Sequence, residues 1–424
     1  MRHALAFILL AYLVREGFEY IVRYLNLRYM GRFGTTVPPE FKLVMDEGVM
    51  RKMRDYEADK TRFGFVSSLS GNIITIVFIF GGLLNVLNSW IVALNLSVAI
   101  SGWLFFLVLF LVSDMVDVPF HLYENFKIEN KYGFNTMTPR LWFSDFIKSL
   151  LLSVILISVL LFAAFGLMQW SEAHWWLWLW GVMLAYGIII LYISPYVIEP
   201  LFNKFSLVED ESLKEKIVGL ARRADIKVTK VMKIDASKRS RHSNAYFTGI
   251  GKTKRIILFD TLIEGMTQEE IVAVLAHEIG HWKRKHVLKS IVAMETFSLI
   301  GLYIAFRLME GDTLTKLFQV ETATVYAKIV IIGFLAGIVA FPLKPVLTYF
   351  ARRCERQADS DCLELTGNGG DAISAFLKLA KENLSNLYPH PLYVLLYYSH
   401  PPMLERIRYM KKEEKTRGSR NVLA

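Results

Sequence analysis

The pentapeptide His277-Glu-Ile-Gly-His281 carries the residue types that a catalytic zinc site needs. On a helix, side chains four positions apart lie on one face, so His277 and His281 can offer two imidazole nitrogens to a single ion. Zinc lowers the pKa of a bound water to about 7, and the neighbouring Glu278 can take a proton from that water and later give one to a leaving amine. The predicted chemistry is metal-assisted hydrolysis of a peptide bond.

The residues before the pentapeptide predict the helix that must position it. Thr267-Gln-Glu-Glu270 has the spacing of a capping box, and Ile271, Val274 and Leu275 supply an apolar face. The alternative is a charged helix whose histidines are merely solvated. The capping box and the apolar face together favour a packed helix that carries the site.

A catalytic zinc needs a third protein ligand and an open position for water or substrate. The segment 352–359 follows a long apolar stretch and offers Glu355 as that ligand. Asp359 lies one turn further along the same face, where it can orient a ligand or donate a proton. Two alternatives remain, in which Glu355 and Asp359 are ordinary surface acids among arginines or the Cys354 thiol binds the metal.

Composition predicts that this chemistry takes place at a membrane. The chain is 54% hydrophobic with a mean hydropathy of +0.35, more than a water-soluble protein of 424 residues needs for its core. A helix that crosses the hydrocarbon needs about 20 mainly apolar residues. Seven segments meet this length, at 4–25, 65–92, 94–118, 147–168, 174–197, 287–309 and 325–349.

The first of these segments is interrupted by Arg15, Glu16, Glu19 and Arg23. It could instead be a signal peptide, but no small-residue cleavage site follows its apolar run. We therefore expect a retained helix, and with seven spans the two termini lie on opposite sides of the membrane.

Lysine and arginine are concentrated in the loop 26–64, the segment 198–286 and the tail from 350, which all fall on one side of the predicted topology. This bias places the zinc domain in the cytoplasm. We interpret the net charge of +10 as a source of attraction to anionic lipids of the bilayer. No nucleic-acid-binding motif accompanies that charge, so nucleic acid is not an expected partner.

Between the fifth and sixth spans, the segment 240–260 reads as a β-hairpin that leads into the zinc helix. A strand beside a peptidase site can pair with the extended backbone of a substrate. Asn244 could then bind substrate backbone or a developing oxyanion, or could simply be a turn residue at the strand entrance.

Four regions follow from this pattern. They are a membrane region with five helices (1–197), the first part of the zinc protease domain (198–286), two further membrane helices (287–349), and the C-terminal part of the protease domain with the third ligand (350–424).

Several motifs together resemble the zinc-dependent type-I CAAX prenyl proteases. They are the zinc pentapeptide at 277–281, Glu355 with Asp359, Ser243-Asn-Ala-Tyr246, Pro200-Leu-Phe-Asn203, Tyr132-Gly-Phe-Asn135, and Ser399-His-Pro-Pro402 with Arg406. The resemblance extends over most of the chain. The pentapeptide occurs in many proteases, whereas its combination with seven spans is specific.

The resemblance implies a gluzincin-type membrane endopeptidase whose helices enclose a large water-filled chamber capped by the protease domain. It implies one Zn²⁺ per chain, bound by His277, His281 and Glu355, with Glu278 as general base. Asp359 is then a further active-site residue. Asn244 and His400 then line the substrate-binding cleft.

In eukaryotic members of this family the substrates are farnesylated Cys-a-a-X proteins, which lose their last three residues. The short far-side loops and the absence of an ER-retrieval signal at 421–424 point to a bacterial member in the inner membrane, with the ER membrane as the eukaryotic alternative. The substrate is then a peptide or protein, either prenylated or membrane-embedded.

Two other functions are compatible with the pattern. Related bacterial membrane zinc proteases cut damaged membrane proteins, so quality control is the chief alternative. A non-catalytic membrane scaffold or lipid carrier with a vestigial metal site is the second. Glu278 discriminates against the scaffold, because a scaffold has no use for a base beside a metal-bound water.

Overall fold

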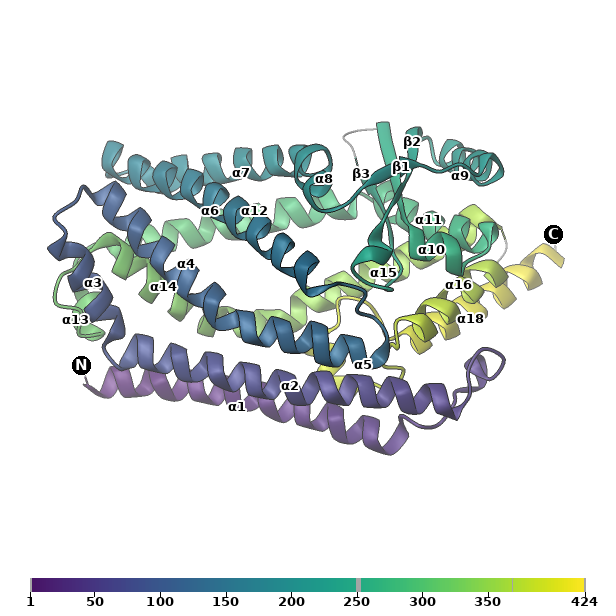
Figure 1. Ribbon diagram of the computed structural model, residues 1–424, viewed down its shortest axis with the longest axis horizontal. Helices are drawn as coiled ribbons and strands as arrows, with labels where there is room; N and C mark the ends of the chain where they lie inside the picture. The colour runs from purple at the N-terminus through teal and green to yellow at the C-terminus, as the bar shows by residue number, and fades with distance from the viewer. Residues whose placement is uncertain (1, 249–252, 368, 423–424) are drawn as a thin grey trace.

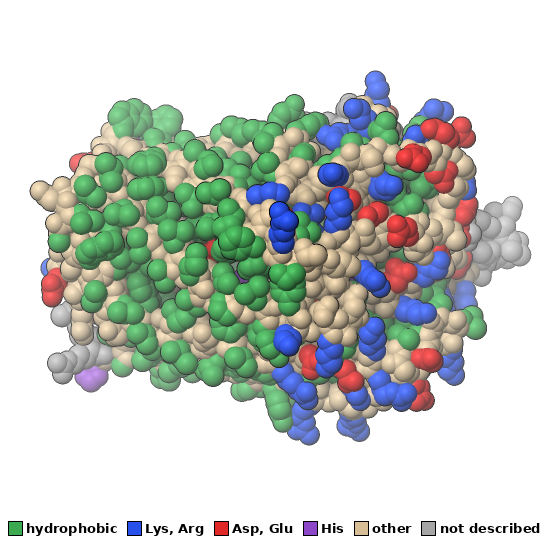
Figure 2. All heavy atoms as spheres, viewed as in Figure 1, with side chains coloured by type: hydrophobic (Ala, Val, Ile, Leu, Met, Phe, Trp, Pro, Cys, Tyr) green, Lys and Arg blue, Asp and Glu red, His purple; other side chains and the backbone are tan. Residues whose placement is uncertain are grey.

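Long helices occupy one end of the molecule, and a mixed region of short helices and strands occupies the other (Figure 1). The computed structural model describes residues 2–248, 253–367 and 369–422. Hydrophobic side chains cover the surface of the helical end, whereas charged side chains cover the mixed end (Figure 2). The chain therefore presents one surface suited to lipid and another suited to water.

Six helical segments in the described part of the chain are long and apolar enough to cross a membrane. Their apolar windows bury at most 17% of their residues inside the protein, as expected where lipid covers the outer surface. The six are α2 (Glu47–Phe80), α4 (Val98–Tyr123) with η2 (Glu124–Glu129) and α5 (Asn130–Tyr132), α6 (Pro139–Trp170), α7 (Trp175–Ile193) with η3 (Ser194–Ile198) and α8 (Glu199–Phe202), α12 (His286–Met309), and α14 (Val325–Ala340) with η5 (Phe341–Leu343) and α15 (Lys344–Thr366).

The first predicted span lies in helix α1 (Arg2–Phe33), which packs against α2 along the lower edge of Figure 1. Its charged residues Arg15, Glu16, Glu19 and Arg23 keep it outside the six apolar segments. A helix is present where we predicted one, and the count of seven membrane spans stays a prediction.

The predicted continuous span at 65–92 is wrong. Helix α2 ends at Phe80, and a separate short apolar helix, α3 (Leu83–Ala93), follows it. The break falls at Gly81 and Gly82, and Gly82 has φ +87°, a left-handed conformation that favours glycine. The glycine pair thus outweighs the continuous hydropathy of this stretch.

The mixed end contains a four-stranded sheet in the order β1-β2-β4-β3. Its strands are β1 (Phe205–Leu207), β2 (Lys227–Ile234), β3 (Ala245–Thr248) and β4 (Thr253–Phe259). Strands β2 and β4 are parallel, while β1–β2 and β3–β4 are antiparallel. The β3–β4 pairing matches the predicted hairpin, whose turn at 249–252 lies outside the described residues. The sheet is larger than predicted because β1 and β2 add to that hairpin.

The largest hydrophobic core lies between one face of this sheet and the helices packed around it. Those helices are α9 (Glu211–Arg223), α10 (Asp260–Gly265), α11 (Gln268–Lys283), α15, α16 (Gly369–Glu382) and α18 (Met403–Val422). Phe41, Met50 and Met53, from the segment that joins α1 to α2 and the start of α2, also belong to this core. The predicted division into four regions stays a prediction.

The remaining described helices are short. They are η1 (Pro39–Phe41), η4 (Ala236–Lys238), α13 (Thr313–Leu317) and α17 (Pro391–Tyr397).

Candidate metal centre

Helix α11 carries both histidines of the pentapeptide. The predicted capping box starts it, because the Thr267 side chain accepts from the Glu270 amide and the Glu270 carboxylate accepts from the Thr267 amide. The Nε2 atoms of His277 and His281 lie 3.1 Å apart on the same face. His277 is buried, so this face points into the protein.

Helix α15 brings Glu355 to the two histidines. Its Oε2 lies 3.4 Å from His277 Nε2, and its Oε1 lies 3.2 Å from His281 Nε2. One donor atom from each of the three side chains lies within 4.8 Å of the others, which is compact enough for a single metal ion. Because α14, η5 and α15 follow one another almost without interruption, a predicted span leads directly into the helix that carries Glu355.

The close approach of α11 and α15 depends on the glycine inside the pentapeptide. A Cβ on Gly280 would lie 2.9 Å from Ala358 Cα and 3.1 Å from Asp361 Cβ. Ala358 is fully buried at this crossing. A small residue on each helix therefore lets the backbones approach until Glu355 reaches the histidines.

Two further contacts hold the same pair of helices together. The Arg284 guanidinium donates to both carboxylate oxygens of Asp361, at 2.6 and 2.8 Å. The Cys362 thiol donates to the Ala273 carbonyl at 3.2 Å. This bidentate ion pair and buried thiol contact restrict sliding of one helix along the other.

The donor set fits a metal cation. Glu355 Oε2 is buried and has no hydrogen-bond partner, although a buried carboxylate oxygen is costly to leave unpaired. Two imidazole nitrogens and one carboxylate form a ligand set that binds divalent metals and leaves positions for water or substrate. The convergence of these atoms is thus explained by a bound cation better than by hydrogen bonding within the protein.

Asp359 lies behind His277 and has no exposed surface. Its Oδ1 is 2.9 Å from His277 Nδ1, the ring nitrogen on the side opposite the cluster. Its carboxylate also accepts from Arg406 Nε at 3.0 Å and Arg406 Nη2 at 2.6 Å. This position suits the orienting role considered for Asp359.

Arg406, on α18, is a site residue to which the sequence assigned no role. It is buried, and its guanidinium carbon lies 4.2 Å from the centre of the Phe376 ring. It balances the Asp359 charge at the back of the cluster. Arg406 stands four residues after Pro402 and was part of the family resemblance. That resemblance gave no indication of its contact with Asp359.

His286 is a second residue that sequence reasoning missed. Its Nδ1 lies 3.1 Å from His281 Nδ1, and its Nε2 lies 3.0 Å from Gln357 Oε1 on α15. Helix α11 ends at Lys283, and Lys285, with φ +55°, precedes the first residue of α12, which is His286. The change of direction between the two helices places His286 beside the histidine pair. The one signal available was a third histidine within ten residues of the pentapeptide.

Glu278 is half-buried beside the two histidines on α11. Burial raises the pKa of its carboxyl above the ordinary value. A carboxyl group whose pKa is shifted toward neutrality is suited to exchanging protons with a reacting group.

His400 lies at the open side of the cluster. Its Nε2 is 3.3 Å from Glu355 Oε1, its Nδ1 is 2.8 Å from Ser399 Oγ, and its side chain is 59% exposed. The structure therefore brings His400 to the metal ligands, at a position that a bound substrate can reach.

Asn244 precedes β3 and is exposed. Its Oδ1 accepts from the Ala245 amide, and its carbonyl accepts from the Phe259 amide. Neither partner belongs to the metal cluster. Strand β3 is at the end of the strand order in the described sheet, with β4 as its neighbour, and it also packs against α11.

Two protein-family models match the chain. "CAAX prenyl protease N-terminal, five membrane helices" matches residues 26–204, and "Peptidase family M48" matches residues 208–414. Together the two matches cover nearly the whole chain, and the second contains every residue of the metal cluster.

Curated relatives of similar length carry CAAX protease names. CAAX prenyl protease 1 homolog of Arabidopsis thaliana is 34% identical over 415 residues, which is 92% of this chain and 94% of that protein. CAAX prenyl protease 1 of Saccharomyces cerevisiae is 34% identical over 414 residues, with 91% and 90% covered. A bacterial relative, the uncharacterized metalloprotease YhfN of Bacillus subtilis, is 30% identical over 312 residues, 73% of each chain.

The crystal structure of S. mikatae Ste24p has the same fold. The TM-score is 0.88 at 28% sequence identity, with 96% of this chain and 98% of that chain covered. This likeness confirms the predicted fold class, a polytopic helical membrane protein with a chamber-forming arrangement and a small sheet. From the family models, the relatives and the helical spans together, we conclude that the chain belongs to peptidase family M48 and is a multi-pass membrane metallopeptidase.

Proposed function

We propose that this protein is a zinc-dependent endopeptidase that removes the C-terminal tripeptide from Cys-a-a-X substrates. The convergence of His277, His281 and Glu355 beside Glu278 is the observation that carries the proposal. Relatives with this activity in their names share about a third of their residues with the chain over nearly its full length, which supports the same substrate class.

Zinc is the metal that the donor set fits best, since two histidines and one glutamate form a familiar catalytic zinc site. When bound, it would supply a Lewis acid that activates water and polarises the scissile carbonyl. His277, His281 and Glu355 would hold one such ion per chain.

Glu278 is the general base and, in the second half of the reaction, the general acid. It takes a proton from the attacking water and passes a proton to the amine that leaves. The raised pKa of its carboxyl reduces the free-energy cost of holding that proton between the two steps.

Two sets of contacts orient the histidine ligands. Asp359 contacts Nδ1 of His277 and is itself held by Arg406. His286 contacts Nδ1 of His281 and is itself held by Gln357. Each contact turns the Nε2 atom of its histidine toward Glu355, as outer-shell partners of metal-binding histidines generally do.

The substrate is an extended peptide that approaches along β3. Main-chain pairing to this strand, which ends the order of the described sheet, would give affinity without strict sequence selection. Asn244 at the strand entrance and His400 beside Glu355 would contact the peptide on either side of the scissile bond.

The mixed end of the molecule faces the cytoplasm. Lys and Arg side chains are gathered at that end in Figure 2, as the positive-inside rule requires. We place the protein in a bacterial inner membrane, or in the ER membrane of a eukaryote. A K216C variant in a cysteine-free background tests this orientation by labelling with a membrane-impermeant thiol reagent. Labelling of the variant in intact cells would contradict the proposed orientation.

The central test is cleavage of a farnesylated Cys-a-a-X peptide and its unlipidated twin by the purified, detergent-solubilised protein. Product masses identify the bond that is cut, and E278Q is the control variant. Tripeptide release from the farnesylated peptide alone, lost in E278Q, is the expected result. Cleavage of both peptides would point to a general membrane peptidase of the quality-control kind.

Cleavage of neither peptide, with stoichiometric metal bound, would contradict the proposed substrate and favour a scaffold or carrier. Elemental analysis of the same preparation identifies the metal. Zinc at one atom per chain is expected, and a H277A variant should lose it.

A further inference from the structure

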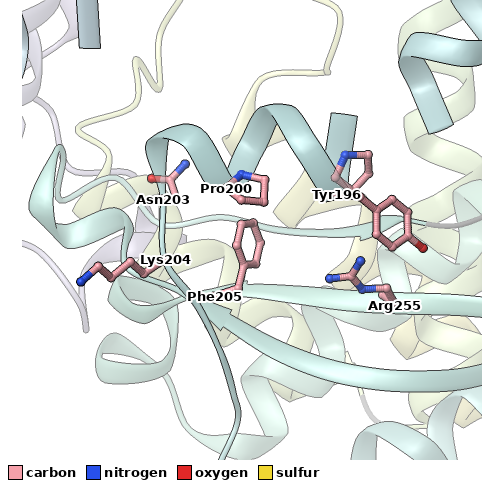
Figure 3. Close-up of a pocket in the computed structure, with 7 residues that line it drawn as sticks. Tyr196, Pro200, Asn203, Lys204, Phe205 and Arg255 are labelled. Atoms are coloured by element: carbon pink, nitrogen blue, oxygen red, sulfur yellow. The ribbon is translucent and has the colours of Figure 1, made fainter. Parts of the chain in front are cut away.

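A pocket lies outside the metal centre, at the point where the fourth apolar segment leaves the membrane region. It has a volume of about 480 Å³, within the usual range for small-ligand sites. In Figure 3, Arg255 and Tyr196 lie at one end of the pocket and Asn203 and Lys204 at the other, with Pro200 and Phe205 between them.

The pocket is built from two elements with different surroundings. One wall is the end of the apolar segment, η3 and α8, and the other is the face of the sheet that carries Phe205 and Arg255. That sheet face packs separately from the main core, around Ile234, Ala236 and Ile257. The pocket is therefore a junction between the membrane helices and the protease region.

Arg255 has unused hydrogen-bonding capacity in this pocket. Its Nε is buried and has no hydrogen-bond partner, and Nη2 donates only to the thioether of Met232, a weak acceptor. Its guanidinium carbon lies 4.7 Å from the centre of the Tyr196 ring, which holds the group in place. In the described part of the chain no carboxylate forms an ion pair with Arg255, so its charge is left for an external anion.

Other donors and cations surround the pocket. The Asn203 Oδ1 accepts from Arg239, which leaves its amide nitrogen as a donor. Lys204 is exposed, and Lys230 is the register partner of Arg255 on β2 and is also exposed. No ion pair of either lysine is found among the described residues. The local field is thus positive.

The nearby carboxylates already have partners. Glu199 accepts from the Tyr246 hydroxyl, and Asp235 pairs with Lys238 at 2.6 Å. They do not line the pocket, and neither forms an ion pair with Arg255.

Exposed apolar side chains continue from the membrane segment to the edge of the pocket. Tyr192, Val197 and Leu201 are 55, 55 and 46% exposed, and Lys204 follows two residues after the segment ends. Figure 2 shows Lys and Arg side chains beginning where the hydrophobic surface ends. An anion bound here would lie at the depth of lipid headgroups, with its acyl chains over these apolar residues.

We propose that this pocket binds the phosphate of an anionic membrane phospholipid. Arg255 contacts the phosphate, Asn203 and Lys204 flank the headgroup, and the acyl chains lie along α7 and η3. The bound lipid joins the end of the membrane helix to the sheet that leads to the metal centre. The proposal is independent of the substrate of the protease.

Native mass spectrometry of the full-length protein, titrated with phosphatidylglycerol or phosphatidylcholine, tests it. We expect one tightly retained phosphatidylglycerol per chain. R255M, which keeps the apolar stem against Tyr196, should weaken that binding by at least about tenfold, because a charge-assisted contact to the phosphate is lost. Thermal unfolding of R255M without lipid verifies that the variant is folded.

The matched control is R140M, since Arg140 is an exposed arginine at the start of another apolar helix, α6, and does not line the pocket. An equal loss in R140M, or no loss in R255M, would overturn the proposal in favour of diffuse surface charge. A second titration uses soluble glycerol phosphate in place of the lipid. If it binds at Arg255 as tightly as phosphatidylglycerol, the site serves a free phosphate ester and the lipid assignment is wrong.

Discussion

Helices α11 and α12 are neighbours in sequence and differ sharply in what surrounds them. Nine of the sixteen residues of α11 are buried, whereas none of the apolar window of α12 is buried inside the protein. Lipid can cover an apolar helix without any specific contact, but a buried helix must match its neighbours in shape. The catalytic chemistry therefore depends on helices that are packed inside the protein, such as α11, where each side chain has a defined partner.

The largest difference in activity should come from replacing one carboxylate on α11 and one on α12. E278Q should lower kcat/KM by about 10²- to 10⁴-fold, because the general base is lost while the ligands remain. E295Q, in α12, should change it by less than about threefold, which is small beside that loss. Peptide cleavage with product masses measures both, and metal analysis should show that both variants retain the ion. If E295Q alone strongly lowered kcat/KM, the catalytic chemistry would depend on α12 and not on α11.

A buried carboxylate behind the ligands gives the next contrast. D359N should weaken metal binding by about 10- to 100-fold, because His277 loses its charged partner and Arg406 is left buried without a counter-charge. D114N, in the apolar helix α4, should leave metal binding unchanged. Competition with a fluorescent chelator measures both affinities. Unchanged affinity in D359N would rule out its orienting role.

Substitution of two glycines in turn tests the crossing of α11 and α15. In G280A the new Cβ meets the α15 backbone at 2.9 Å, and overpacking of this kind costs about 1–3 kcal/mol. The expected result is roughly tenfold weaker metal binding, because Glu355 is displaced from the histidines. In G301A nothing lies within 4 Å of the new Cβ, so no change is expected. Equal effects would show that the crossing is not the source of the geometry.

The last contrast concerns the cap of α11, where the expected effect is on stability and not on catalysis or metal binding. Glu270 is buried and accepts from Ser374, Lys378 and the Thr267 amide. Although burial acts to raise the pKa of its carboxyl, these donors lower it below the ordinary value. The ionised form therefore stabilises the fold above the unfolded pKa of about 4.3, and this stabilisation is lost as pH falls through the folded pKa.

E270Q should accordingly reduce the free energy of unfolding by about 1–3 kcal/mol at neutral pH, and the difference from the parent should shrink below about pH 4. Thermal unfolding in detergent across this range measures it. E310Q, which removes an exposed ion pair at the end of α12, should change stability by less than about 1 kcal/mol. A constant difference at all pH values would show that the Glu270 charge is not involved.

Much of the fold could be predicted because its signals are local. Hydropathy over about 20 residues located the apolar helices, and the capping box located the start of α11. The prediction at 65–92 was wrong for a local reason as well, since Gly81 and Gly82 interrupt a run that hydropathy alone joins. Strands β1 and β2 were missed because short strands become apparent only when paired with partners distant in sequence.

The sequence by itself determined the chemistry available: two histidines at helical spacing, a glutamate between them, and an acidic pair on a later helix. Tertiary structure decided which of these groups meet and what each one touches. Asp359 is buried behind His277 because α15 crosses α11 at Gly280, and His286 and Arg406 join the site from the start of α12 and from the distant helix α18. Spacing along a helix specifies a shared face, whereas contact between helices depends on packing over long sequence separations.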